Sequence, residues 1–397
     1  MKREVAQEVQ VTGLVKGGDG LARVNGEVWF IPGAAPGDRL LCERSETRER
    51  YTRARIRKIL APSPKRVEPP CPLAGHCGGC PWQHLSREAQ QQAKEDIVFD
   101  LFDRSLPPDS DSRSALEAFS FIPMPGDGMN WRNRFQFHRS ASFDIAISPI
   151  GLMDNEGQKV VPLDDCPIAH PLIREALKEK RIKVPLASNR FTVFASGDTL
   201  LVEGGREEAR IRLKDRDILM NAGLFFQSNV TMLELLLGRL TGYLESAGPF
   251  RRALDLYAGV GTFSLFLKDH CETLMLMERE ARSLSIARSN LAGVNAEFRA
   301  MTDDEWARSM ERSARTTAPL ADIALIDPPR AGLSKQMRNW LSASQIPRIA
   351  CVSCDPASLA RDIAALDLAG YRLASLDAFE FYPHSPHIES LAILEKR

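Results

Sequence analysis

The sequence predicts an α/β fold in three parts, with a small β-barrel, an α+β middle domain and a C-terminal doubly wound sheet. Short strands separated by turn residues fill residues 5–58, a cysteine-rich loop follows, and apolar strands alternate with helical stretches from about residue 217. Alternating strands and helices are typical of a mostly parallel sheet covered on both faces. The expected domains are 1–60, 61–216 and 217–397.

Composition excludes several classes of protein. The 397 residues include 52 basic and 52 acidic side chains, so any site for a polyanion must be a local patch. The N-terminus lacks the apolar run of a signal peptide, and no stretch of about 18 uninterrupted apolar residues occurs. We therefore expect a cytoplasmic protein that does not associate with membranes. In such a chain the eight cysteines indicate metal ligands or catalytic thiols rather than disulfides.

The barrel is predicted from closely spaced strands in the first 58 residues. Asn25-Gly26 between two alternating strands predicts a tight hairpin. A later strand is dense in basic residues, which suits either an RNA phosphate backbone or simple solvation, because most charge runs are merely exposed. These basic residues are Arg48, Arg50, Arg53, Arg55, Arg57 and Lys58. Four prolines between residues 62 and 70 then end the barrel.

The middle domain has weaker signals. Residues 87–102 are predicted to be helical, and residues 106–128, rich in Pro, Ser and Asp, to form a loop. Residues 131–139 alternate as a strand, with Arg132, Arg134, Gln136 and His138 on one face. That face could contact RNA, but a half-solvated strand is the favoured interpretation.

A cysteine loop carries the first chemical motif. Cys71, Cys77 and Cys80 follow one another in a Gly-rich segment, and Cys166 could supply a fourth ligand. Four thiolates suit a tetrahedral zinc ion or a [4Fe-4S] cluster equally well, and the spacing does not choose between them. Unrelated buried cysteines are the less favoured alternative.

A methyl-donor site is predicted at the start of the C-terminal sheet. Asp255 ends a strand and is followed by Gly259-Val-Gly261, where glycines permit close approach of a nucleotide-like ligand. Glu278 ends the next strand and is placed to accept hydrogen bonds from ribose hydroxyls. Together with Asp327-Pro328-Pro329, this pattern favours S-adenosylmethionine over a dinucleotide or a non-catalytic sheet.

A nucleophile is predicted at Cys354, between a strand and a helix that begins near Ala357. A thiol at a helix N-terminus can have a lowered pKa and act as a thiolate. Addition of a thiolate to carbon 6 of uracil makes carbon 5 nucleophilic enough to take a methyl group, and a base must then remove the proton from carbon 5. Glu389 is the candidate base. A redox pair of Cys351 with Cys354 is disfavoured, because strand alternation puts them on opposite faces.

These motifs resemble the RNA (uracil-C5-)methyltransferase family, most closely its 23S rRNA branch with a TRAM domain and an iron–sulfur cluster. The resemblance implies an OB-like TRAM β-barrel that binds RNA, a middle domain with an iron–sulfur loop, and a Rossmann-like methyltransferase sheet that uses S-adenosylmethionine. It implies that Cys354 is the nucleophile and Glu389 the proton acceptor. It also implies that the donor is contacted by Gln227, Tyr257, Glu278 and Asp327, and that a [4Fe-4S] cluster is held by Cys71, Cys77, Cys80 and Cys166.

One residue departs from the family pattern. Similar proteins usually have Ser-Cys-Asn-Pro around the nucleophile, whereas this chain has Asp355 after Cys354. An extra carboxylate would raise the pKa of the thiol unless Asp355 turns away to cap the following helix.

The predicted function is formation of 5-methyluridine in 23S rRNA by a monomer with no obligate protein partner. The uridine must leave its base stack, because neither the thiol nor the donor reaches carbons 6 and 5 inside a helix. Three alternatives stay open: a tRNA uracil-C5 methyltransferase, a cytosine-C5 methyltransferase, and a catalytically impaired, metal-stabilised RNA-binding protein.

Overall fold

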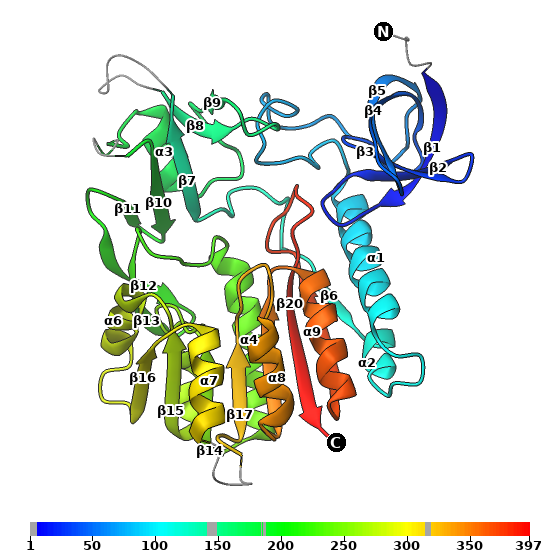
Figure 1. Ribbon diagram of the computed structural model, residues 1–397. Helices are drawn as coiled ribbons and strands as arrows, with labels where there is room; N and C mark the ends of the chain where they lie inside the picture. The colour runs from blue at the N-terminus through cyan, green and yellow to red at the C-terminus, as the bar shows by residue number, and fades with distance from the viewer. Residues whose placement is uncertain (1–5, 141–148, 184, 186–187, 314–318) are drawn as a thin grey trace.

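The computed structural model describes residues 6–140, 149–183, 185, 188–313 and 319–397. The chain forms a barrel, a middle region and a large sheet with helices on both faces (Figure 1). Within these ranges, no helix combines the length and apolar character needed to cross a bilayer.

The N-terminal barrel is closed, as predicted. Its strands are β1 (Gln7–Leu14), β2 (Gly20–Val24), β3 (Glu27–Ile31), β4 (Arg39–Thr47) and β5 (Thr52–Ala61), in the order β1-β2-β3-β5-β4. Trp29 and Leu40 are fully buried in its core. The predicted hairpin is confirmed, since β2 pairs antiparallel with β3 and the connecting Asn25 and Gly26 have φ of 52° and 85°.

Helix α1 (Arg87–Ser105) extends the predicted helix by three residues at its C-terminal end, and Ser86 caps its N-terminus by accepting a hydrogen bond from the Ala89 amide. The prediction of a continuous loop over 106–128 is wrong. This stretch contains α2 (Arg113–Glu117) and β6 (Ser120–Ile122), and β6 joins the edge of the C-terminal sheet. Elements of three to five residues are too short to show a periodic pattern of apolar residues in the sequence. β6 is stabilised by its parallel pairing with β19.

The middle region contains a five-stranded sheet in the order β11-β10-β7-β8-β9. Its elements are β7 (Arg134–Arg139), β8 (Ile150–Met153), β9 (Val160–Pro162), α3 (Pro171–Lys178), β10 (Arg190–Ser196) and β11 (Thr199–Val202), and a hairpin of β12 (Glu208–Leu213) and β13 (Arg216–Asn221) follows. The predicted alternation in β7 is confirmed, because Phe135 and Phe137 are fully buried while Gln136 is exposed.

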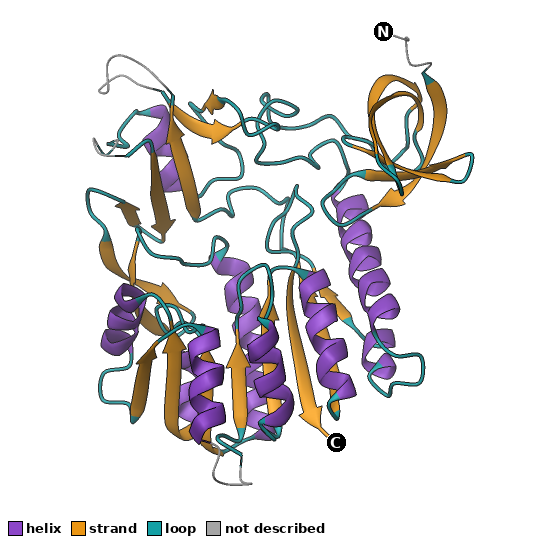
Figure 2. Cartoon of the chain, in the orientation of Figure 1, coloured by secondary structure: helices purple, strands orange, loops and turns teal. Residues whose placement is uncertain are grey.

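The C-terminal sheet has eight strands in the order β16-β15-β14-β17-β18-β20-β19-β6. β20 is the strand that runs antiparallel to its neighbours. Figure 2 shows α4 behind this sheet and α7, α8 and α9 in front, which confirms the doubly wound prediction. The elements are α4 (Val230–Ala247), β14 (Phe250–Leu256), α5 (Ser264–Leu267), η2 (Lys268–His270), β15 (Cys271–Glu278), α6 (Ala281–Asn290), β16 (Ala296–Ala300), α7 (Asp303–Ser313), β17 (Ile323–Ile326), α8 (Lys335–Ala343), β18 (Arg348–Ser353), α9 (Pro356–Leu368), β19 (Tyr371–Phe379) and β20 (Glu389–Lys396).

Candidate active site

The carboxyl ends of the parallel strands meet at one edge of the C-terminal sheet, facing the middle region and the barrel (Figure 1). Ligands of open α/β sheets bind at this edge, because the loops and helix N-termini gather there. Glu278 is the last residue of β15, Asp327 follows β17, and Cys354 follows β18. Three of the predicted site residues therefore lie along the same edge.

The glycine loop and Glu278 are in direct contact. The Gly259 amide donates to Glu278 Oε2 at 3.0 Å, and the Glu280 amide donates to Oε1 at 2.7 Å. Gly259 and Gly261 both have positive φ, 55° and 80°, which suits glycine. The two amides fix the orientation of the carboxylate, and each oxygen keeps lone-pair capacity for a ribose hydroxyl. The arrangement suits the nucleoside part of a methyl donor.

Two buried carboxyl groups lie beside this loop. Burial raises the pKa of Asp255 to about 7, and burial together with the negative charges of Asp255 and Glu278 raises the pKa of Asp327 to about 8. Ser264 donates to Asp255 Oδ2, while Asp255 Oδ1 has no hydrogen-bond partner in the part of the chain that the structure describes. A cationic ligand is favoured here, since it would relieve the repulsion among these groups. S-adenosylmethionine carries both a sulfonium and an ammonium group.

Tyr257 and Gln227 are placed differently. Tyr257 has a φ of 67° and its hydroxyl donates to Asp303 Oδ2 at 3.1 Å. Asp303, the first residue of α7, is a candidate contact to the methyl donor that sequence reasoning missed. The sequence signal that could have indicated it is an acidic residue three positions after the end of β16. Gln227 is buried in the segment before α4, where the cap residue Asn229 donates to the Phe381 carbonyl at 2.9 Å. That bond ties the Gln227 segment to the loop that precedes Glu389.

Cys354 lies between β18 and α9, as predicted, and is partly buried. Its pKa is raised to about 12, first by burial and then by the negative charges of Glu389 and Asp327, while Arg330 acts in the opposite direction. The expectation of a lowered pKa at the helix N-terminus is therefore wrong for the ligand-free protein, since burial and two carboxyl groups outweigh the helix.

Asp355 turns away from the thiol and caps α9. Its side chain accepts from the Ser358 amide at 2.8 Å, so the carboxylate is committed to the helix N-terminus. Lys16 Nζ, from the barrel, lies 2.6 Å from the other carboxylate oxygen. These contacts lower the pKa of Asp355 despite its partial burial.

Glu389 begins β20 and stands next to Cys354. Ser353 pairs with Ser390 across β18 and β20, which brings the following Cys354 beside the preceding Glu389. The Glu389 side chain is 1% exposed, and its Oε2 has no hydrogen-bond partner among the described residues. Burial and the charge of Asp327 raise its pKa well above the usual value. A buried carboxyl with a free oxygen beside a thiol is suited to proton transfer.

The loop before Glu389 is held by α1, which sequence reasoning did not detect. Glu380 is fully buried and accepts from Arg87, and Lys94 Nζ donates to the Tyr382 carbonyl at 2.9 Å. Burial lowers the pKa of Lys94 to about 8, against the opposing effect of Glu380. His384, in the left-handed region at φ 64°, donates its amide to Gln90 Oε1 at 2.7 Å. This network fixes the chain on the approach to Glu389.

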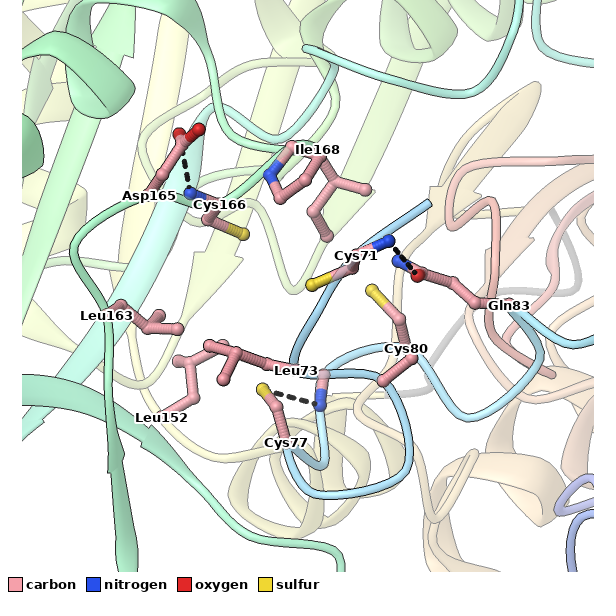
Figure 3. Close-up of a pocket in the computed structure, with 13 residues that line it drawn as sticks. Cys71, Leu73, Cys77, Cys80, Gln83, Leu152, Leu163, Asp165, Cys166 and Ile168 are labelled. Atoms are coloured by element: carbon pink, nitrogen blue, oxygen red, sulfur yellow. Dashed lines mark hydrogen bonds between the residues drawn. The ribbon is translucent and has the colours of Figure 1, made fainter. Parts of the chain in front are cut away.

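The four predicted cysteine ligands line one pocket (Figure 3). Cys166 reaches it from a distant segment, and Leu152, Leu163 and Ile168 provide apolar walls. Burial and neighbouring thiols raise the pKa of Cys80 to about 12. A Cβ on Gly78 would lie 2.8 Å from the Asp154 carbonyl oxygen, so the tight loop requires glycine there. Over the described ranges, no three Cys, His, Asp or Glu side chains are grouped so that they could hold a metal ion.

Comparison with known proteins identifies the family. A family model described as tRNA (Uracil-5-)-methyltransferase matches residues 173–397, more than half of the chain. The chain belongs to this family of RNA (uracil-5-)-methyltransferases. A TRAM domain model matches residues 4–56, which coincide with most of the barrel. The predicted family, fold class and enzyme class are thereby confirmed: the protein is a methyltransferase that uses S-adenosylmethionine and acts on RNA.

Similar proteins cover nearly the whole chain. An uncharacterized RNA methyltransferase from Treponema denticola is 32% identical over 94% of this chain and 94% of its own length. A protein from Halomonas elongata named 23S rRNA (uracil(1939)-C(5))-methyltransferase RlmD is 30% identical over 99% of this chain and 90% of its own length. The crystal structure of Pyrococcus abyssi tRNA (uracil-54, C5)-methyltransferase with S-adenosyl-L-homocysteine has a TM-score of 0.71 at 24% identity, covering 98% of this chain and all of that one. The last similarity concerns the fold alone.

Proposed function

We propose that this enzyme forms 5-methyluridine in 23S rRNA, with Cys354 as nucleophile and Glu389 as proton acceptor. The observation that carries the proposal is the pairing of β18 with β20, which puts the Cys354 thiol beside the buried Glu389 carboxyl. Asp327 influences the pKa of both groups, so the pair is close to the buried carboxyl groups of the proposed donor site. The assignment of 23S rRNA is supported by the Halomonas relative.

In the proposed reaction Cys354 forms and later breaks a bond to the base, and Glu389 takes up a proton. The Cys354 thiolate bonds to carbon 6 of the uracil, and the electrons of the carbon 5–carbon 6 double bond shift onto oxygen 4 as an enolate. Carbon 5 then takes the methyl group, and the donor leaves as a neutral thioether. Glu389 accepts the proton from carbon 5, the double bond forms again, and the bond between carbon 6 and sulfur breaks to free Cys354.

The charges suit this order of events. In the free enzyme, burial and the negative charge of Asp327 raise the pKa of both Glu389 and Cys354. A cationic donor beside Asp327 lowers both pKa values, because it offsets the negative charge that raises them. Arg330 already acts in this direction on both groups. Binding of a cationic donor would therefore favour the ionised forms of Cys354 and Glu389 that the reaction needs.

Gln227, Tyr257, Glu278 and Asp327 are the proposed donor contacts, with Asp303 added on the hydrogen bond from Tyr257. Of these, Glu278 has the strongest support, because two backbone amides hold its carboxylate at the glycine loop. The proposed division of the chain remains 1–60, 61–216 and 217–397, and a monomer is sufficient because barrel and catalytic sheet lie on one chain.

A [4Fe-4S] cluster is the proposed occupant of the cysteine pocket, held by Cys71, Cys77, Cys80 and Cys166. Four soft thiol ligands and apolar walls fit such a group. The cluster would hold together the loop at 71–80 and the segment of Cys166, and no chemical step is assigned to it.

The test is methyl transfer from labelled S-adenosylmethionine to unmodified ribosomal and transfer RNA in separate reactions. The product nucleoside is identified, and its position mapped, by mass spectrometry. We expect 5-methyluridine in 23S rRNA. Product found in tRNA alone would contradict the assignment of 23S rRNA but support uracil methylation. Formation of 5-methylcytidine would show that the substrate base is cytosine. Donor binding without any product would contradict the assignment of catalytic activity.

A further inference from the structure

One side chain of α1 clamps His384, in the loop before Glu389. Gln90 is fully buried, and its Oε1 accepts from the His384 amide at 2.7 Å. Its Nε2 lies 3.2 Å from His384 Nδ1. Burial, together with the positive charge of Arg87, lowers the pKa of His384 to about 4, so at neutral pH the ring is uncharged and Nδ1 can accept this hydrogen bond. Gln90 therefore holds both the backbone and the ring of His384.

The backbone conformation of His384 needs such support. Its φ is 64°, in the left-handed region that residues other than glycine seldom adopt. Residues persist there when the surrounding contacts hold them, and they gather at functional sites. The Trp82 amide supplies a further contact, because it donates to the His384 carbonyl at 3.0 Å. Gln90 and Trp82 thus hold the loop in a conformation that its own backbone disfavours.

Gln90 also binds the end of the cysteine loop. Its Nε2 lies 3.1 Å from the Trp82 carbonyl oxygen and 2.9 Å from the Leu85 carbonyl oxygen. Trp82 is buried and follows Cys80, a proposed cluster ligand, by two residues. Gln90 therefore lies where α1, the cysteine loop and the loop before Glu389 meet.

The position of the Glu389 carboxyl depends on this last loop. Within the ranges that the structure describes, Glu389 Oε2 has no hydrogen-bond partner, so its place follows from that of the backbone. Glu389 is the first residue after the loop that joins β19 to β20, and its neighbour Ser390 is the first to pair with β18. Four residues separate it from His384, and one of them is Pro386, whose ring fixes φ. A shift at His384 is therefore passed to Glu389 over a short segment.

We propose that Gln90 is a positioning residue of the reaction, which holds His384 in its left-handed conformation so that the Glu389 carboxyl reaches the proton on carbon 5. This role rests on the proposed function of Glu389, and it needs no contact of Gln90 with RNA or donor. Thiolate addition and methyl transfer come before proton removal, and only proton removal uses Glu389 as a base. Loss of the clamp should therefore slow the last step selectively.

The experiment compares Gln90→Met with wild type, using labelled S-adenosylmethionine and an unmodified RNA that the wild type methylates. Met has about the length of Gln and suits a buried helix position, but it makes neither hydrogen bond to His384. We expect kcat to fall about tenfold to a hundredfold, with the KM for RNA within about twofold. The covalent adduct of enzyme and methylated RNA should accumulate. An adduct at the wild-type level in folded Gln90→Met that still binds the donor would overturn the proposal.

The matched control makes the same change elsewhere on α1. Gln92 is exposed, and its Nε2 donates to Asp96 Oδ1 at 2.9 Å on the helix surface. Gln92→Met should therefore keep the kcat and the adduct level of wild type, and an adduct here as well would contradict a specific role of Gln90. Unfolding by denaturant is measured for each variant. If Gln90→Met does not fold, Gln90→Asn replaces it, since its amide is one methylene too short for the clamp, and the adduct should accumulate in the same way.

A second substitution tests the role of the backbone conformation. Glycine adopts the left-handed region without a steric cost, so the loop of His384→Gly has less need of the clamp. Gln90→Met should lower kcat about threefold or less in the His384→Gly background, against about tenfold or more when His384 is present. Because each fall is a ratio, any effect of the glycine itself cancels. Equal falls in the two backgrounds would show that Gln90 does not act through His384, and the proposal would fail.

Glu389→Gln keeps this test distinct from that of the proposed function. If Glu389→Gln turns over at the wild-type rate, the assignment of the base fails, and the role of Gln90 fails with it. If Glu389→Gln accumulates the adduct and Gln90→Met does not, the role of Gln90 alone fails.

Discussion

Replacement of Glu389 by Gln tests the most specific part of the mechanism. Gln has nearly the same shape but cannot accept the proton from carbon 5. Because Glu389 is 1% exposed and carries a raised pKa, its neutral form is the one that the ligand-free fold accommodates. A neutral amide should therefore preserve the fold while it removes the base.

The expected loss can be bounded. A positioned general base contributes roughly 10²–10⁴ in rate, which corresponds to roughly 3–5 kcal/mol of barrier. Thiolate addition and methyl transfer precede the lost step, so the methylated RNA should stay bonded to Cys354. Glu389→Gln should therefore lower turnover by at least about a hundredfold and accumulate a covalent adduct of enzyme and methylated RNA.

The assay combines multiple turnover with denaturing electrophoresis. Turnover follows label in free RNA, and the adduct is protein-bound label that survives denaturation. Cys354→Ala is the matched control and should form no adduct. Wild-type turnover in Glu389→Gln would refute the assignment of the base, and loss of turnover without an adduct would place the defect before methyl transfer.

Four further outcomes are expected. Cys354→Ala should abolish turnover and leave RNA affinity within about threefold in a filter-binding assay, since it removes only a sulfur atom; retained methylation would exclude Cys354 from the mechanism. Glu278→Ala should weaken donor binding about tenfold or more by calorimetry, because it removes the acceptor for ribose hydroxyls, whereas unchanged affinity would exclude that contact. Protein purified without oxygen should be brown and absorb visible light, and Cys77→Ser should reduce this absorbance; colourless protein with stoichiometric zinc would contradict the cluster. Asp255, whose pKa is raised from 3.8 to about 7 in the fold, stabilises the protein below its unfolded pKa and loses that effect as the pH rises through 7. The unfolding free energy of wild type should therefore fall by roughly 3 kcal/mol more than that of Asp255→Asn between pH 5 and pH 8, measured with denaturant, and parallel curves would contradict this.

The sequence predicted residues whose position follows from local pattern. Strands β14, β15, β17 and β18 each contain a short apolar stretch, and parallel strands bring their carboxyl ends to one edge. Glu278, Asp327 and Cys354 each end or follow such a strand, so their proximity could be expected before the structure was known. Glu389 was predicted from its place at the start of the final strand. The structure shows why it reaches the site: β20 runs antiparallel to its neighbours, so its first residue lies at the same edge.

Other features needed the tertiary structure. β6 has three residues and depends on β19, so no local period announces it. Lys94 and Glu380 are polar residues in otherwise ordinary segments, yet both are fully buried, because α1 lies against the loop that carries Glu380. Secondary-structure propensity and apolar patterns describe residues that are close along the chain. They therefore cannot predict a contact between residues nearly 300 positions apart.

The pKa of Cys354 shows why a motif alone misjudged the direction in which the pKa of this thiol is shifted. Its local context, a thiol at the start of α9, predicts a lowered pKa. The fold adds burial and the charges of Glu389 and Asp327, which raise it, and the opposing charge of Arg330 does not outweigh them. Glu389 on β20 and Asp327 after β17 lie on other strands than Cys354, which follows β18, so the local context of the thiol could not give the direction of its pKa shift.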